Sequence, residues 1–246
     1  MVIDKNDKAY QKIIKKGSGS VLKGLRAVKG GGLGCMAGGI VLLIFGLVFA
    51  VPDLIFGIAE GKMGGALLSA MFLIAPGLLC VVIGSVLKNK RNSSYMEFYQ
   101  KETGLGEEEL KQVDRELTSP NVQMIGYIKA GSRNERGIAC FITDNYFVTE
   151  WYYVRRIEDM VAAAYSDSED IWGLLCLAKN DKEVHFETYG APADKKQGLC
   201  TEIVAALKNR KDIIPAQFFT LNGKQYDLRK NSRELLDCLE TLANDH

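Results

Sequence analysis

Apolar and polar positions are segregated along this chain, and the segregation predicts its elements. Two long stretches, 30–52 and 63–87, carry no charged residue. Each contains about 20 mainly apolar residues, the length that a helix rising 1.5 Å per residue needs to cross a hydrocarbon core of about 30 Å. Neither stretch has a polar face. We therefore predict a hairpin of two transmembrane helices within 30–88, at about 33–52 and 65–87, joined by a short external loop.

The charges beside these stretches predict their orientation. Eight basic residues lie within 1–29, and four more follow the second stretch, whereas the loop between the stretches holds one. Positive charge is retained on the cytoplasmic side of a membrane, so both termini are expected to be cytoplasmic. We expect a multi-pass protein of a bacterial plasma membrane that has membrane lipids among its partners.

The first 29 residues are interpreted as a basic cytoplasmic tail, for which two readings stay open. Val21, Leu22, Leu25 and Val28 share one helical face, with basic residues elsewhere around it. Such a segment can lie as a helix in the membrane interface and attract anionic headgroups. Alternatively, the charges only set the topology of the two spans.

Small residues recur at a spacing of four in both apolar stretches. Gly34 and Gly38 form one such pair, and Gly65 and Ser69 form the other. Small residues at this spacing allow two helices to approach closely. We therefore assign these four residues to helix packing, either between the two helices or between copies of the protein.

The polar remainder of the chain alternates helical and strand-like patterns. Residues 89–121 are expected to form a helical connector. Residues 122–210 contain about six short runs rich in β-branched and aromatic residues, followed by a helix at about 194–210. Residues 211–246 add a hairpin around Asn222-Gly223 and a final helix. The predicted fold class is α+β with antiparallel strands, attached to the helical hairpin.

Short motifs in 122–210 carry a family resemblance. Residues 140–149 read CFITDNYFVT and residues 156–161 read RIEDMV, with further strands and a closing helix after them. This run resembles a bacterial pleckstrin-homology-like (PH-like) domain, in which a C-terminal helix plugs a bent sheet and which often sits beside paired membrane spans. The resemblance implies a binding or assembly module rather than a catalyst.

Charge and motif content narrow the function further. The whole chain carries 31 basic and 30 acidic residues, but residues 102–246 hold 18 basic and 25 acidic ones, which argues against nucleic acid as a partner. No nucleophile, phosphate-loop or zinc motif is present, so no enzyme activity, cofactor or metal is expected. His185, with Cys140 or Cys176 as nucleophile, is the one enzymatic alternative that we keep.

A binding surface is predicted on one short segment. Arg155 and Arg156 suggest a basic edge for an anionic group, and Trp151 and Tyr152 lie beside it in a run of three aromatic residues that cannot all face one core. We predict a membrane-anchored, non-catalytic module that binds a protein partner or ligand, or associates with itself. The alternatives are an accessory subunit of a transporter or envelope complex, and a membrane-anchored enzyme that uses His185.

Overall fold

A computed structural model describes residues 1–28, 38–45, 47–48, 74–83, 85–86, 95–168 and 171–244. The chain divides into two compact units. The first consists of Met1–Leu25 with Met96–His246, and the second of Arg26–Tyr95. Because residues far apart in sequence form the first unit, the second unit is inserted between its parts.

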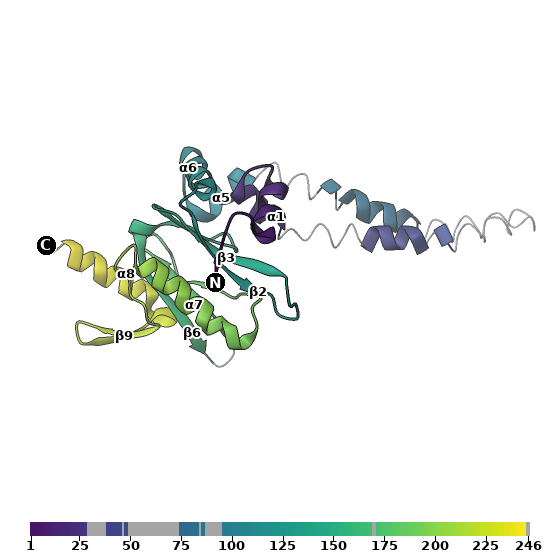
Figure 1. Ribbon diagram of the computed structural model, residues 1–246. Coiled ribbons are helices and arrows are strands. Elements are labelled where there is room, and N and C mark those ends of the chain that lie inside the picture. Colours follow the sequence, from purple (N-terminus) through teal and green to yellow (C-terminus); the bar gives the residue numbers. More distant parts are fainter. Residues whose placement is uncertain are drawn as a thin grey trace, which may run out of the picture. The chain divides into compact units, whose positions relative to one another are not determined.

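The first unit contains a five-stranded antiparallel sheet with the strand order β1-β2-β3-β4-β5 (Figure 1). Its strands are β1 (Val2–Ile3), β2 (Gln123–Ile128), β3 (Arg136–Ile142), β4 (Tyr146–Thr149) and β5 (Val154–Arg156). Alternate residues point to opposite faces of a strand. Ile125, Cys140 and Phe147 therefore face one core, whereas Met124, Phe141 and Val148 face another.

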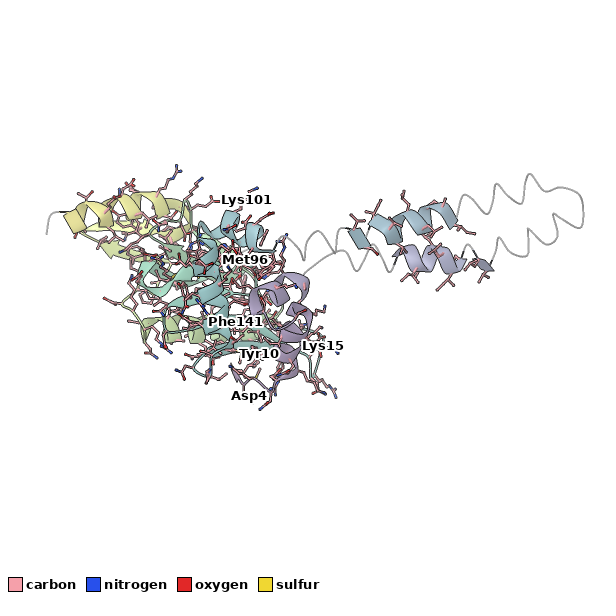
Figure 2. All side chains as sticks on the ribbon, turned by 90° about the horizontal axis from the view of Figure 1, so that it is seen from above. Asp4, Tyr10, Lys15, Met96, Lys101 and Phe141 are labelled. Carbon is pink, nitrogen blue, oxygen red and sulfur yellow. The ribbon has the colours of Figure 1, made fainter. Side chains whose placement is uncertain are left out.

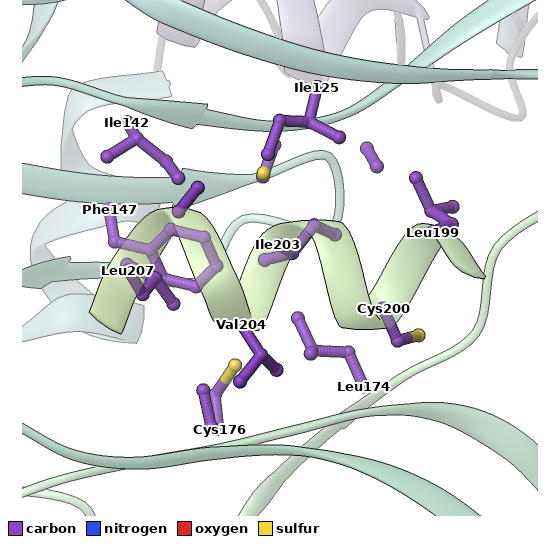
Figure 3. Packing of buried hydrophobic residues seen from close by; sticks show 14 of the residues in the cluster. Ile125, Ile142, Phe147, Leu174, Cys176, Leu199, Cys200, Ile203, Val204 and Leu207 are labelled. Atoms are coloured by element: carbon purple, nitrogen blue, oxygen red, sulfur yellow. The ribbon is translucent and has the colours of Figure 1, made fainter. Parts of the chain in front are cut away.

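A second sheet, of three strands, completes the inner core. It contains β6 (Met160–Ser168), β7 (Ile171–Ala178) and β8 (His185–Glu187), all antiparallel. The helix α7 (Ala193–Lys208) packs against both sheets. Figure 3 shows Ile203 and Leu207 of α7 with Ile125 of the first sheet on one side and Leu174 of the second sheet on the other. The α+β class and the antiparallel sheets predicted from the sequence are confirmed.

Four helices belong to the other side of the five-stranded sheet. They are α1 (Lys8–Gly17), α2 (Val21–Val28), α5 (Tyr95–Thr103) and α6 (Glu107–Thr118). The helix α1 packs against β3, and Figure 2 shows its Tyr10 on the side of Phe141 and its Lys15 at the outer surface. The Tyr99 hydroxyl of α5 donates to the Leu22 carbonyl of α2 over 3.1 Å. Val21, Leu22 and Leu25, which the sequence analysis placed on an interfacial face, are buried in this unit.

A last layer covers the outer face of the three-stranded sheet. It consists of the hairpin β9 (Phe218–Leu221) and β10 (Lys224–Asp227) with the helix α8 (Leu228–Asn244). Leu175 and Leu177 of β7 form a second core with Tyr226, Leu228 and Leu235 from this layer. Both faces of the three-stranded sheet are therefore buried.

The membrane-spanning hairpin is a prediction that the structure contradicts. Within the described parts of the chain, no helix combines the length and the apolar character needed to cross a membrane. Helical segments are described at 38–45 and 74–83. The rest of the two predicted spans lies outside the described residues. The multi-pass plasma-membrane assignment depended on these two spans and is therefore also contradicted.

In the second unit, two glycines of the described segments allow a close backbone approach. A Cβ atom on Gly39 would lie 2.9 Å from the Gly77 carbonyl oxygen, so only glycine fits there without a shift. Gly38, by contrast, has open space where a Cβ would stand. Gly34, Gly65 and Ser69 lie outside the described residues. Small residues thus allow close packing between Gly39 and Gly77, neither of which is one of the four predicted packing residues.

Candidate interaction site around Trp151

The candidate site is the tight loop that joins β4 to β5. The Thr149 N–H donates to the Tyr153 carbonyl over 2.9 Å, and the Tyr153 N–H donates back to the Thr149 hydroxyl. The three aromatic residues between or at these closing bonds, Trp151, Tyr152 and Tyr153, contact three different parts of the unit. The loop therefore has a fixed conformation, set by its partners on every side.

Trp151 is held at two points and is still half exposed. Its backbone N–H donates to the Glu187 carboxylate over 3.0 Å, and its indole Nε1 donates to the Thr188 carbonyl over 3.0 Å. Both acceptors belong to β8 or the residue after it, so the loop is tied to the three-stranded sheet. Nevertheless, 48% of the Trp151 surface is exposed. A large aromatic side chain is thus presented to solvent in one orientation.

Tyr152 is covered by the helix α5. Its ring meets the rings of Phe98 and Tyr99 edge-on, with centroids 5.2 and 6.0 Å away. Its φ of 76° lies in the left-handed region, which costs a residue other than glycine of the order of 1 kcal/mol. The aromatic packing offsets this strain. Tyr152, predicted as a contact for a partner, is instead partly buried against the protein itself.

Two buried carboxylates stand behind the loop. Glu187 is 1% exposed and accepts a hydrogen bond from the Tyr189 hydroxyl over 2.7 Å, as well as the one from Trp151. Glu150 is 8% exposed and accepts from the Tyr127 hydroxyl over 3.1 Å. Burial, followed by the nearby carboxylates, raises the pKa of both tyrosines. The two phenols therefore stay protonated at neutral pH and act as donors to these acids.

Tyr153 belongs to a second polar network on the inner side of the loop. Its hydroxyl donates to Asp181 over 2.6 Å, and the same carboxylate accepts from Arg155 Nε over 2.7 Å. The Arg155 guanidinium lies 4.6 Å above the Tyr153 ring, and His185 stacks on that ring at a centroid distance of 4.4 Å. The Asp181 side chain is only 3% exposed. The predicted cation at Arg155 is therefore neutralised within the fold.

Arg156 points away from Arg155, because adjacent residues of a strand face opposite sides. Its guanidinium forms an ion pair with Glu109 of α6, and a longer one with Glu158. The hydrogen bond from Arg156 is the main reason why the pKa of the Glu109 carboxyl lies below its usual value. The structure thus does not bring the two arginines together into one basic edge. Each of them ties β5 to another element.

The residues of the enzyme alternative, His185 and Cys176, are cross-strand neighbours, but the cysteine is buried. His185 pairs across the strands with Cys176, and its Nε2 lies 3.9 Å from Glu187. Cys140 and Cys176 are fully buried, and burial raises the pKa of both thiols well above the usual value. A thiolate nucleophile is disfavoured there. Among the residues that the structure describes, no cluster of His, Cys, Asp and Glu could hold a metal ion.

Sequence reasoning missed the acids that position this loop. Glu187 and Asp181 were not among the predicted site residues, yet both are buried beside the loop. The one signal for Glu187 is the alternation of His185, Glu187 and Tyr189, which places three polar or amphipathic side chains on a single face. Nothing in the local pattern shows that this face points inward.

Comparisons with protein-family models, with curated proteins and with solved structures found no match for this chain. The PH-like resemblance therefore stays a prediction.

Proposed function

We propose that the first unit is a non-catalytic module that binds a protein partner through Trp151. The observation that carries this proposal is the combination of exposure and fixation at this residue. The indole is 48% exposed, while its backbone and its ring nitrogen are both hydrogen-bonded to the strand β8 region. A tryptophan already held in one orientation loses little conformational freedom when a partner covers it.

The chemistry of the side chain favours a protein surface as its partner. Tryptophan is enriched among the residues that dominate protein–protein interfaces, where truncation to alanine typically costs 2 kcal/mol or more. Its Nε1 already donates within the fold, and about half of the residue stays exposed. We therefore expect the partner to present an apolar or aromatic pocket surrounded by polar groups.

The architecture supports the same proposal. A four-strand run, β2 to β5, is followed by three further antiparallel strands and then by α7, which packs against both sheets. A closing helix after a bent sheet is what the PH-like resemblance implies. Helices and the β9–β10 hairpin occupy the outer faces of the sheets. A partner is therefore expected to reach this module at its loops and edges, where Trp151 lies.

Cross-linking in the native cell tests the proposal, with the second tryptophan as a matched control. Trp172 is also exposed, at 41%, but lies on the strand β7 rather than on the loop. The full chain, its Trp151→Ala variant and its Trp172→Ala variant are cross-linked in cells, purified and compared by mass spectrometry. We expect a discrete protein partner that is lost in Trp151→Ala and kept in Trp172→Ala.

Two outcomes would contradict the proposal. One is recovery of the same cross-linked proteins with the wild-type chain and with both variants, when all three have the same thermal stability. The other is recovery of the wild-type chain with only a small molecule attached, because the partner would then not be a protein.

A further inference from the structure

The strand β9 has an open edge, which follows from the register of its hairpin. Asn222 and Gly223 form the two-residue turn, both with positive φ, as a type I′ turn requires. Leu221 therefore forms a hydrogen-bonded pair with Lys224, and Phe219 with Tyr226. The same alternation continues to the bond from the Leu228 N–H to the Gln217 carbonyl. The N–H and C=O groups of the residues between, Phe218 and Thr220, must point away from β10.

The two edges of the hairpin differ. On the β10 side, the Asp227 N–H donates to the Asn231 side chain over 3.3 Å, and α8 packs against the strand. On the β9 side, the sequence Phe-Phe-Thr-Leu carries no charge and no proline, the usual devices that prevent an edge from pairing. Phe218, at 69%, is the most exposed large apolar side chain among the described residues. Figure 1 shows the hairpin standing out from the rest of the unit.

We propose that β9 pairs with β9 of a second copy of this chain, antiparallel and about a two-fold axis. The outward groups fit this arrangement, because Phe218 then forms a hydrogen-bonded pair with Thr220 of the second copy, and Thr220 with Phe218 of that copy. The two Phe219 residues face each other at the axis. The two hairpins join into one four-stranded sheet.

Two features favour a second copy over an unrelated extended peptide. The two-fold arrangement covers both copies of Phe218, each beside the small Thr220 side chain of the other. Because the strand is uncharged, self-pairing brings no like charges together at the edge. This inference rests on the hairpin alone and is independent of the role of Trp151.

The test compares two lysine substitutions on the same face of the hairpin. Thr220→Lys places a charge on the open edge, opposite Phe218 of the second copy and diagonally across from the same charge on that copy. Gln225→Lys places the same charge on the covered strand, directly across from Thr220. Sedimentation velocity of the full chain over a concentration series measures the dimer. We expect wild type and Gln225→Lys to dimerise alike, and Thr220→Lys to raise the dissociation constant at least about tenfold.

Amide hydrogen exchange of the wild-type chain gives a second readout that needs no variant. The amides of Phe218 and Thr220 should become protected as the concentration rises, whereas those of Phe219 and Leu221 stay protected throughout by β10. A chain that stays monomeric, exchange of Phe218 and Thr220 that does not depend on concentration, or a dimer unaffected by Thr220→Lys would each overturn the proposal.

Discussion

Replacing Glu187 by alanine tests whether the buried carboxylate fixes the Trp151 loop. The substitution leaves the Trp151 N–H and the Tyr189 hydroxyl without the acceptor that now lies 3.0 and 2.7 Å away. Each buried donor without a partner costs about 1–3 kcal/mol, and the lost side chain leaves a cavity. Removing a buried carboxylate also relieves its own desolvation, which acts in the opposite direction. We expect the free energy of unfolding to fall by about 2–4 kcal/mol, from a total that is typically 5–15 kcal/mol.

Urea unfolding monitored by tryptophan fluorescence measures this loss, since the chain has two tryptophans and both lie in the first unit. Glu187→Gln keeps an acceptor for the Trp151 N–H and can still bond to Tyr189, so its loss should stay below about 1 kcal/mol. Glu183→Ala is the matched control, because Glu183 is exposed and lies four residues earlier. If Glu187→Ala proves as mild as Glu183→Ala, the carboxylate does not hold the loop and our account of the site fails.

Three further predictions concern other parts of the first unit. Burial acts to raise the pKa of the Asp7 carboxyl, but the hydrogen bond from the Ala9 N–H and the Arg136 guanidinium outweigh it and lower the pKa. The ionised Asp7 carboxylate therefore stabilises the fold at pH values above its pKa in the unfolded chain, and this contribution is lost as pH falls through its lower pKa in the folded protein. In urea titrations, Asp7→Asn should lower the free energy of unfolding at pH 7 and have a smaller effect at pH 3. Burial raises the pKa of the Cys200 thiol to about 12. In the native protein at pH 8, iodoacetamide should therefore label Cys200 far more slowly than it labels the thiol of an unstructured peptide. After unfolding the two labelling rates should be equal, which peptide mass spectrometry can measure. Gly223→Ala should cost about 1 kcal/mol in thermal unfolding, because Gly223 has a φ of 76° with open space around it; no loss would show that the turn can change type.

Local patterns predicted most elements of the first unit, because the evidence for them lies within a few residues. The helical pattern predicted within 89–121 includes α5 and α6, and the runs rich in β-branched and aromatic residues within 122–210 include β7. The two apolar stretches were read as membrane-spanning helices from their composition alone. Among the described residues, no helix has the length and apolar character that this reading requires.

The candidate site depended on pairings that no local pattern contains. An alternating strand is expected to have one buried and one exposed face, and in the run 184–187 the apolar residues are Val184 and Phe186. The β9–β10 hairpin and α8 cover the Phe186 side as well, and on the other side Glu187 is buried while His185 is partly buried. Likewise, Arg155 and Arg156 were predicted to form one basic edge because they are adjacent in sequence. Their ion pairs with Asp181 and Glu109 join residues distant in sequence, so no local pattern indicates them.

The first unit is built from two segments that are far apart in sequence, and this has a consequence for the order in which the chain folds. The strand β1 pairs with β2, so Val2 can pair with Ile125 only after more than a hundred further residues have been synthesised. At 5–20 residues per second, the delay on the ribosome is on the order of ten seconds. During that time Val21, Leu22 and Leu25, fully covered in the finished unit, have no sheet and no α6 to pack against. The basic residues around them keep this nascent segment charged during that time, and the first unit can be completed only after α6 and β2 have been synthesised.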